Sequence, residues 1–162
     1  MGSGATAPEG RKNGAHIYQP AHACHLLHPR TRTVDCRRHS ADLHSYLGGI
    51  LRELHATPIA IGGTTDHVHL LTRLPADLAV ADCLRVIKTN SSRWVKEKWP
   101  ERQSFGWQGG YGAFSVSESN RANLIRYIEG QARHHLRISF QDEFLGLLRK
   151  HGVEFDEQYI WR

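Results

Sequence analysis

The sequence predicts an α+β fold, in which strands are interleaved with amphipathic helices. Three observations indicate it. Residues 58–74 contain two short apolar runs separated by glycines and threonines, a pattern typical of a β-hairpin. Leucine and isoleucine recur at helical spacing over 43–54 and again over 78–87. A third stripe with helical period runs through 124–136, with arginines and a glutamate on the opposite side.

Capping and breaking residues place the ends of these elements. Ser40 or Asp42 can cap the first helix and Asp77 the second, because short polar side chains accept hydrogen bonds from free backbone amides. The second helix should stop before Pro100. Residues 113–117 are expected to form a short strand that leads into the third helix.

Length and composition favour a single domain with a polyanionic partner. Residues 1–14 lack apolar periodicity and are expected to form a disordered leader, which leaves 15–162 as one domain. The 21 Lys and Arg residues outnumber the 16 Asp and Glu residues, and the net charge of +5 suits a nucleic acid. Three cysteines without Cys-x-x-Cys spacing argue against a disulfide framework and favour a reducing, cytoplasmic location. No apolar run approaches the roughly 18 residues of a membrane span.

Two segments carry candidate catalytic chemistry. In the hairpin, strand alternation places His67 and His69 on one face while Val68 points the other way, so two imidazoles can meet one divalent ion. On the third helix, a spacing of four residues brings Tyr127 and Gln131 side by side. A phenol, an amide oxygen and two imidazoles suit metal-assisted attack of a tyrosine on a phosphodiester. The sequence therefore predicts a DNA-strand transferase.

Chance and packing offer simpler explanations for the same residues. With 12 histidines in 162 residues, about one His-x-His triplet is expected at random. Tyr127 could be a packed tyrosine with a satisfied hydroxyl group. The hairpin context favours the functional interpretation of the triplet, because apolar strand residues precede it and continue beyond it.

Basic, hydroxyl and aromatic side chains gather late in the second helix and in the glycine-rich loop that follows. They are Arg85, Lys88, Asn90, Ser91, Ser92, Arg93 and Trp94 on the helix, with Trp107 and Tyr111 in the loop. Such a set can bind phosphates and stack on unpaired bases. Two other interpretations stay open: an ordinary solvated helix face, and aromatic side chains that pack the loop onto the sheet.

Several stretches of the chain resemble one known family. They are DLHSYLGGI from Asp42, GGTTDHVHLL from Gly62, RVIKTNSSRW from Arg85, WQGGYGAFSVS from Trp107, YIEGQARHH from Tyr127 and, near the end, FQDEFLGLLRKHGVEFDEQYIW. They resemble the single-tyrosine HUH transposases of insertion sequences, especially the REP-associated tyrosine transposases. The resemblance implies a ferredoxin-like (RRM-like) HUH palm, an antiparallel sheet with helices on one face.

The resemblance also implies roles for individual residues. His67, His69 and Gln131 would be metal ligands, with Mg²⁺ or Mn²⁺ as the expected ion. Two imidazoles and an amide alone would bind later transition ions more tightly. Tyr127 would form a 5′-phosphotyrosine link to single-stranded DNA and free a 3′-hydroxyl group.

Partners and proton transfer are further expectations from the family. The substrates would be single strands that form hairpins, such as extragenic palindromes. The assembly would be a homodimer in which the tyrosine helix of one subunit serves the histidine pair of the other. His134 and His135 are candidates to assist deprotonation of the phenol.

Two positions depart from the family pattern. Gly130 stands where the family usually has asparagine, and it should loosen the helix between nucleophile and ligand. Where the family has an apolar first strand, residues 21–32 are AHACHLLHPRTR. A reading frame displaced by one nucleotide can encode a strand of the family type there, so we hypothesise that residues 13–38 were translated in a displaced frame. The central sheet would then lack an apolar strand, and folding or activity would be impaired.

Two other functions compete with an active transposase. One is a catalytically impaired or domesticated remnant that still binds hairpin DNA, and formation of a covalent DNA adduct would separate it from an enzyme. The other is a metal-dependent hydrolase of small molecules, which the lack of an acidic metal cluster in the sequence disfavours.

Overall fold

The computed structural model describes residues 21–27, 39–64, 66–131 and 139–156. The predicted leader, residues 1–14, lies outside them. The elements in chain order are β1 (Ala21–Leu27), α1 (Ser40–Glu53), β2 (Thr57–Gly63), β3 (His67–Arg73), α2 (Val80–Lys98), the short 3₁₀ helix η2 (Pro100–Arg102), β4 (Gly112–Val116), α3 (Glu118–Glu129) and α5 (Phe140–Lys150). Within these residues, no helix is both long and apolar enough to cross a membrane.

The four strands form one antiparallel sheet in the order β2-β3-β1-β4. With helices between β1 and β2 and between β3 and β4, this order is that of a ferredoxin-like fold. The two central strands, β3 and β1, pair along their whole length from Ala21 opposite Arg73 to Leu27 opposite His67. The predicted α+β class and the antiparallel sheet are confirmed.

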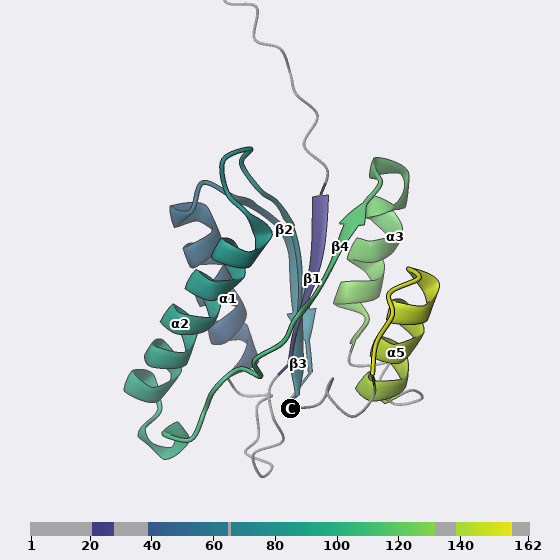
Figure 1. The fold of residues 1–162 in the computed structure, drawn as a ribbon. Coiled ribbons are helices and arrows are strands. Elements are labelled where there is room, and N and C mark those ends of the chain that lie inside the picture. The colour runs from purple at the N-terminus through teal and green to yellow at the C-terminus, as the bar shows by residue number, and fades with distance from the viewer. Residues whose placement is uncertain (1–20, 28–38, 65, 132–138, 157–162) are drawn as a thin grey trace, which may run out of the picture.

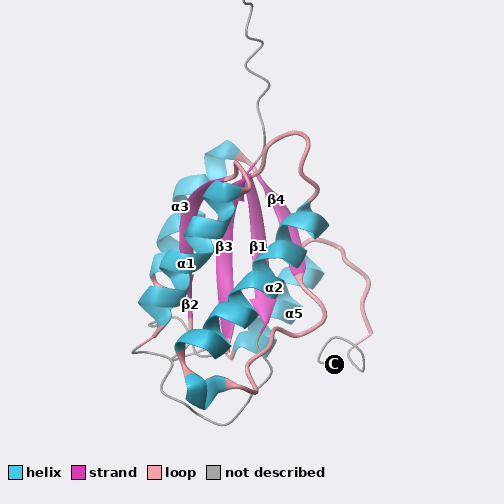
Figure 2. Cartoon of the chain, turned by 90° about the vertical axis from the view of Figure 1, so that its left-hand side faces the viewer, coloured by secondary structure: helices cyan, strands magenta, loops and turns pink. Residues whose placement is uncertain are grey.

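Helices cover both faces of this sheet. Figure 1 shows α1 and α2 on one side of the strands and α3 and α5 on the other, and Figure 2 views the α1 and α2 side. Alternate residues of β3 supply the two cores, with Val68 and Leu70 facing α1 and α2, and Leu71 packed with Ile128 of α3. The expectation of helices on one face therefore holds for α1 and α2 only, because β3 is apolar on both of its faces.

The first strand forms despite its departure from the family pattern. Ala21 and Ala23 are buried in the cluster under α3, and Cys24 is buried in the core under α1 and α2. Burial raises the pKa of the Cys24 thiol to about 12, and the nearby Cys83 adds to the effect. Small side chains thus fill both faces at the sheet centre, and β1 pairs with β3 and β4 although it lacks the apolar run of the family. The expected impairment of activity stays a prediction.

The second helix starts later than its predicted cap. Asp77 lies in a turn in which the amide of Leu78 donates to the carbonyl of Pro75 at 3.2 Å. Helix α2 begins at Val80 with Ala79 as its N-cap residue, and no side chain caps it. Asp77 therefore belongs to the turn after β3, and the helix begins only at Val80.

Candidate active site

The two histidines of β3 face the α3 side of the sheet. Their side chains are almost fully buried, with His67 1% and His69 2% exposed. The ring centroids lie 4.7 Å apart at an interplanar angle of 75°. Strand alternation places both imidazoles on one face, as predicted.

Gln131 brings its amide oxygen to both imidazoles. Its Oε1 lies 3.2 Å from Nε2 of His67 and 3.0 Å from Nε2 of His69. The amide nitrogen of the same side chain donates to the backbone carbonyl of Tyr127 at 3.3 Å, which turns the oxygen toward the histidines. Helix α3 ends at Glu129 with Gly130 as its C-cap residue, yet Gln131 still reaches the site and is 1% exposed.

A glycine on β2 sets the distance between the sheet and α3. A Cβ atom at Gly62 would lie 2.5 Å from the backbone oxygen of Ile128 and 2.9 Å from its Cγ2 atom. Only a hydrogen fits there, so the helix backbone rests directly on the strand. Gly62 is paired with His69 in the sheet. This close contact holds the helix that carries Tyr127 over the histidine pair.

Asp66 and Thr64 orient the first histidine from behind. The carboxylate Oδ1 of Asp66 lies 2.7 Å from Nδ1 of His67 and accepts a hydrogen bond of 2.7 Å from the Thr64 hydroxyl. The hydrogen bond with His67 is the main reason that the pKa of Asp66 lies far below its usual range, against an opposing effect of burial. An ionised carboxylate at Nδ1 keeps the proton on that nitrogen. The lone pair of Nε2 in His67 then points toward Gln131.

This donor set fits a divalent metal ion. An imidazole lone pair and an amide oxygen that face each other at 3.2 Å repel unless a positive charge lies between them. Asp66 behind a coordinating histidine is also the usual arrangement that orients such a ligand. Within the described ranges, no three His, Cys, Asp or Glu side chains alone could hold a metal, so the site depends on Gln131.

Tyr127 lies beside this group. It is half-buried on α3, four residues before Gln131, and its ring meets the His69 ring edge-on, with centroids 5.6 Å apart and planes at 65°. The structure therefore brings together all four residues predicted for the catalytic site, His67, His69, Tyr127 and Gln131.

Comparison with known proteins decides the family. The model of IS200-like transposases matches residues 20–131, which include β1, the histidine pair, Tyr127 and Gln131. This chain belongs to the IS200-like transposase family. The recognition made from the sequence is confirmed.

Individual relatives agree with this assignment. The ISDra2 transposase TnpA of Deinococcus radiodurans is 34% identical over 71 residues, 41% of this chain and 51% of that protein. This chain thus spans about half the length of that curated relative. A candidate transposase of Deinococcus radiodurans R1, 23% identical, superposes with a TM-score of 0.57 over 77% of this chain and 98% of its own.

A second solved structure also shares the fold. It is a REP-associated tyrosine transposase bound to a REP hairpin, 15% identical, with a TM-score of 0.58 over 74% of this chain and 70% of its own. At such identities the likeness of both solved structures establishes the fold of this transposase. The hairpin belongs to that protein.

Sequence reasoning missed Glu143 of this transposase. Its side chain on α5 is 7% exposed, and its Oε1 lies 3.6 Å from Nε2 of His69. Burial is the main reason that the pKa of Glu143 rises to about 7, and the nearby Asp66 adds to it while His67 opposes it. Asp66 and Thr64 were also missed, although they lie just before His67 in the matching stretch GGTTDHVHLL.

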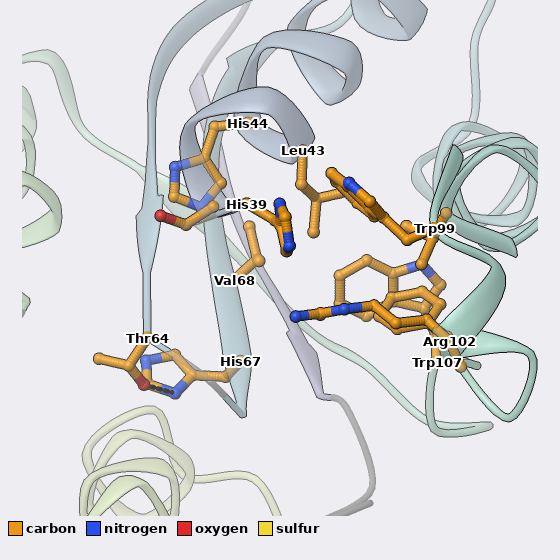
Figure 3. Close-up of a pocket in the computed structure, with 12 residues that line it drawn as sticks. His39, Leu43, His44, Thr64, His67, Val68, Trp99, Arg102 and Trp107 are labelled. Atoms are coloured by element: carbon orange, nitrogen blue, oxygen red, sulfur yellow. Dashed lines mark hydrogen bonds between the residues drawn. The ribbon is translucent and has the colours of Figure 1, made fainter. Parts of the chain in front are cut away.

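A pocket opens beside His67 on the other side of the sheet (Figure 3). His39, Leu43 and His44 line it from the start of α1, and Trp99 and Arg102 line it from the end of α2 and η2. Thr64 and His67 lie together at one end. Tyr127, His69 and Gln131 do not line this pocket, so it adjoins the candidate site only at His67.

Two of the predicted DNA-binding residues, Ser91 and Trp107, make hydrogen bonds within the protein. Ser91 is completely buried, and its hydroxyl donates to the carbonyl of Ile87 at 2.6 Å. The indole nitrogen of Trp107 donates to the same hydroxyl at 2.8 Å. Ser91 therefore cannot touch DNA, and Trp107 packs the glycine-rich loop onto α2 of the transposase.

Lys88 holds the same loop. Its ammonium group donates to the backbone carbonyls of Gln108 at 2.9 Å, Gly109 at 3.0 Å and Gly110 at 2.7 Å. Burial lowers the pKa of Lys88. An ammonium group has three N–H donors, so these carbonyls occupy all of them and give Lys88 a structural role in the transposase.

The other candidates for DNA binding lie at or near the surface of α2 and the loop. Trp94 is half-buried and stacks on Tyr46 with centroids 4.3 Å apart, so one ring face is covered. The remaining candidates are partly or fully exposed: Arg85, Asn90, Ser92, Arg93 and Tyr111. Arg85, Asn90, Ser92 and Arg93 belong to α2, which lies on the side of the sheet opposite α3. The two histidines proposed to assist the transposase, His134 and His135, lie outside the described residues.

Proposed function

We propose that this protein is a metal-dependent transposase and endonuclease of single-stranded DNA, which cleaves and rejoins DNA through a 5′-phosphotyrosine on Tyr127. The convergence of Nε2 of His67, Nε2 of His69 and Oε1 of Gln131 within 3.2 Å carries the proposal. The ring of Tyr127 next to His69 supplies the nucleophile that such a group would serve.

The proposed chemical step is the one that the family resemblance implies for Tyr127. The phenolic oxygen of Tyr127 attacks the phosphorus atom, and the bond between phosphorus and the 3′ oxygen breaks. The departing oxygen takes up a proton and leaves as a 3′-hydroxyl group, while the 5′ phosphate stays bonded to the tyrosine. A 3′-hydroxyl of another strand reverses the step, so rejoining needs no external energy source.

Each residue has a separate task in this step. A divalent ion, Mg²⁺ or Mn²⁺, held by His67, His69 and Gln131 would polarise the phosphate and stabilise the charge that develops on the leaving oxygen. Asp66 fixes the orientation and tautomer of His67. The phenol must lose its proton before attack, since an ordinary tyrosine has a pKa of about 10.

The substrate is proposed to be single-stranded DNA that contains a hairpin. The net charge of +5 and the exposed arginines of α2 support a polyanionic partner. The REP-associated transposase of the same fold is bound to a hairpin. A homodimer is proposed as the assembly, although the described residues bring Tyr127 and Gln131 to the histidines of their own chain.

A remnant that binds hairpin DNA without cutting it is the second candidate. The first strand favours it, because residues 21–27 depart from the apolar pattern of the family. Burial of Ala21, Ala23 and Cys24 in the sheet speaks for the active enzyme instead.

A covalent adduct with DNA tests the proposal. Labelled single-stranded DNA with a hairpin is incubated with the full chain and Mn²⁺ or Mg²⁺, and a protein–DNA band is sought by denaturing electrophoresis. We expect a band that EDTA and Tyr127→Phe abolish. The matched control is Tyr46→Phe, which keeps the stacked ring between α1 and α2 and should leave the band unchanged.

Each other result has a distinct meaning. Hairpin binding with no covalent band in the wild type would favour the remnant. Cleavage that survives Tyr127→Phe would overturn the tyrosine mechanism and favour a metal-dependent hydrolase.

A further inference from the structure

A buried carboxylate from the last described helix reaches the histidine pair. Oε1 of Glu143 lies 3.6 Å from Nε2 of His69. The same nitrogen lies 3.0 Å from Oε1 of Gln131, which in turn lies 3.2 Å from Nε2 of His67. Glu143 therefore lies next to His69, at the side of the group that His67, His69 and Gln131 form.

The separations are those of atoms that share one ion. Bonds of about 2.0–2.1 Å at right angles, as in the octahedral sites of Mg²⁺, place neighbouring ligand atoms about 3 Å apart. The two contacts of Gln131 match this spacing, and the contact of Glu143 is a few tenths of an ångström longer. As they are placed among the described residues, His67, His69 and Glu143 do not form a group that could hold an ion. The Glu143 side chain would have to move closer to join one when the metal binds.

We propose that Glu143 is a fourth protein ligand of the divalent metal, in addition to His67, His69 and Gln131. The proposal rests on the metal-dependent function proposed above and deepens it, because it assigns the ligand that selects the ion.

Ligand chemistry supports this assignment. Two imidazoles and an amide oxygen favour later transition ions, whereas carboxylates favour Mg²⁺ and Mn²⁺. Glu143 supplies the hard anionic oxygen that the other three ligands lack. With it, the donor set suits the ions expected for the transfer of a phosphodiester.

The burial of Glu143 points the same way. Its side chain is only 7% exposed. The next residue on the same helix, Phe144, is packed in an apolar cluster. A carboxylate taken out of water costs free energy unless a positive charge is close. A divalent ion beside His69 would add a positive charge close to this carboxylate.

Metal binding without DNA tests the proposal. Mn²⁺ affinity is measured on the DNA-free full chain from the electron paramagnetic resonance of unbound Mn²⁺, for the wild type, Glu143→Gln and Glu154→Gln. The last is the matched control, because Glu154 is an exposed carboxylate of the same C-terminal region. We expect Glu143→Gln to raise the Kd for Mn²⁺ about 10-fold or more. The control should leave it unchanged, and Ni²⁺ affinity should fall less than Mn²⁺ affinity.

If Glu143 had only a structural role, its replacement would lower the stability of the metal-free protein. The metal-ligand proposal predicts the following results instead. Thermal unfolding without metal should show Glu143→Gln to be as stable as the wild type or more so, because the variant buries no charge. The increase in Tm on addition of Mn²⁺ should shrink. Should this variant fail to fold, Glu143→Met keeps similar volume without an oxygen and is expected to lose Mn²⁺ affinity in the same way.

The outcomes separate this proposal from the function on which it rests. Wild-type Mn²⁺ affinity in a folded Glu143→Gln or Glu143→Met variant overturns the role of Glu143 and leaves the three-ligand site intact. Failure of the wild type itself to bind Mn²⁺, with no difference from His67→Ala, overturns both the metal-dependent function and the fourth ligand.

Discussion

At the scale of single residues, the catalytic group depends on side chains that would touch neither the metal nor DNA. Asp66 lies 2.7 Å from Nδ1 of His67, and Thr64 in turn donates to Asp66. These two contacts hold the ring in one orientation and one tautomer. The sequence alone could have predicted this role of Asp66, because it directly precedes the first histidine. A carboxylate commonly binds the second ring nitrogen of a coordinating histidine and fixes its orientation.

Replacement of Asp66 tests this orienting role. Asp66→Asn removes the charge that holds the proton on Nδ1, so Nε2 of His67 becomes a poorer ligand. We expect the affinity for Mn²⁺ to fall about 10- to 100-fold, as measured by titration of the DNA-free protein. The control is Asp82→Asn, which removes an exposed carboxylate paired with Arg85 on α2. An Asp66→Asn variant with unchanged affinity would contradict the inferred tautomer.

At the scale of elements, α3 is placed by its contact with β2. The backbone of Ile128 lies against Gly62, where a Cβ atom would come within 2.5 Å of the helix carbonyl. The proposed nucleophile Tyr127 lies on this helix, and the proposed ligand Gln131 follows it directly after Gly130. Residue alternation and helical spacing predicted which side chains share a face, but no pattern in the sequence shows that two backbones touch at this glycine.

A methyl group at this position should separate the helix from the sheet. We expect Gly62→Ala to destabilise the protein by about 1–3 kcal/mol through overpacking and to abolish the covalent DNA adduct. Denaturant unfolding and the adduct assay measure the two effects. Gly49→Ala on α1 is the control, since no atom lies within 4 Å of the added carbon, and helix propensity predicts a small gain in stability. Full adduct formation by Gly62→Ala would show that the contact does not position Tyr127.

The first strand shows what residue types alone do not predict. AHACHLL has no continuous apolar run, yet β1 lies in the sheet centre between β3 and β4. Alanine and cysteine are small enough to fill both faces beneath the covering helices. The pattern predicted a defect because it compared residue types with a family, whereas the space that each residue must fill depends on its neighbours across the sheet.

At the scale of the whole molecule, one chain supplies every residue that we propose for the catalytic site. His67 and His69 come from β3, Tyr127 and Gln131 from α3 and the residues just after it, and Glu143 from α5. Only Ser117 connects β4 to α3, so the helix is tied closely to the sheet of its own chain. The tyrosine, the histidines and the glutamine were predicted from local spacing. Glu143 was not, because the position of α5 beside β3 depends on the packing of the whole fold.

Mixed variants test whether the site is built within one chain. Tyr127→Phe lacks the nucleophile, and His67→Ala lacks a ligand. If each helix serves its own chain, a mixture of the two inactive variants should give no covalent DNA adduct by denaturing electrophoresis. An adduct in the mixture, with none in either variant alone, would instead show that helices are exchanged between the subunits of a dimer.

Because helices cover both faces of the sheet, the proposed DNA-binding residues and the proposed nucleophile lie on opposite sides of the molecule. The exposed arginines of α2 lie on one side, and Tyr127 lies on the other. A nucleic acid that touched both would have to run around an edge of the sheet, and an unpaired strand bends more easily than a duplex. The distance around the edge of the sheet would then determine how many unpaired nucleotides separate a bound duplex from the cleaved bond.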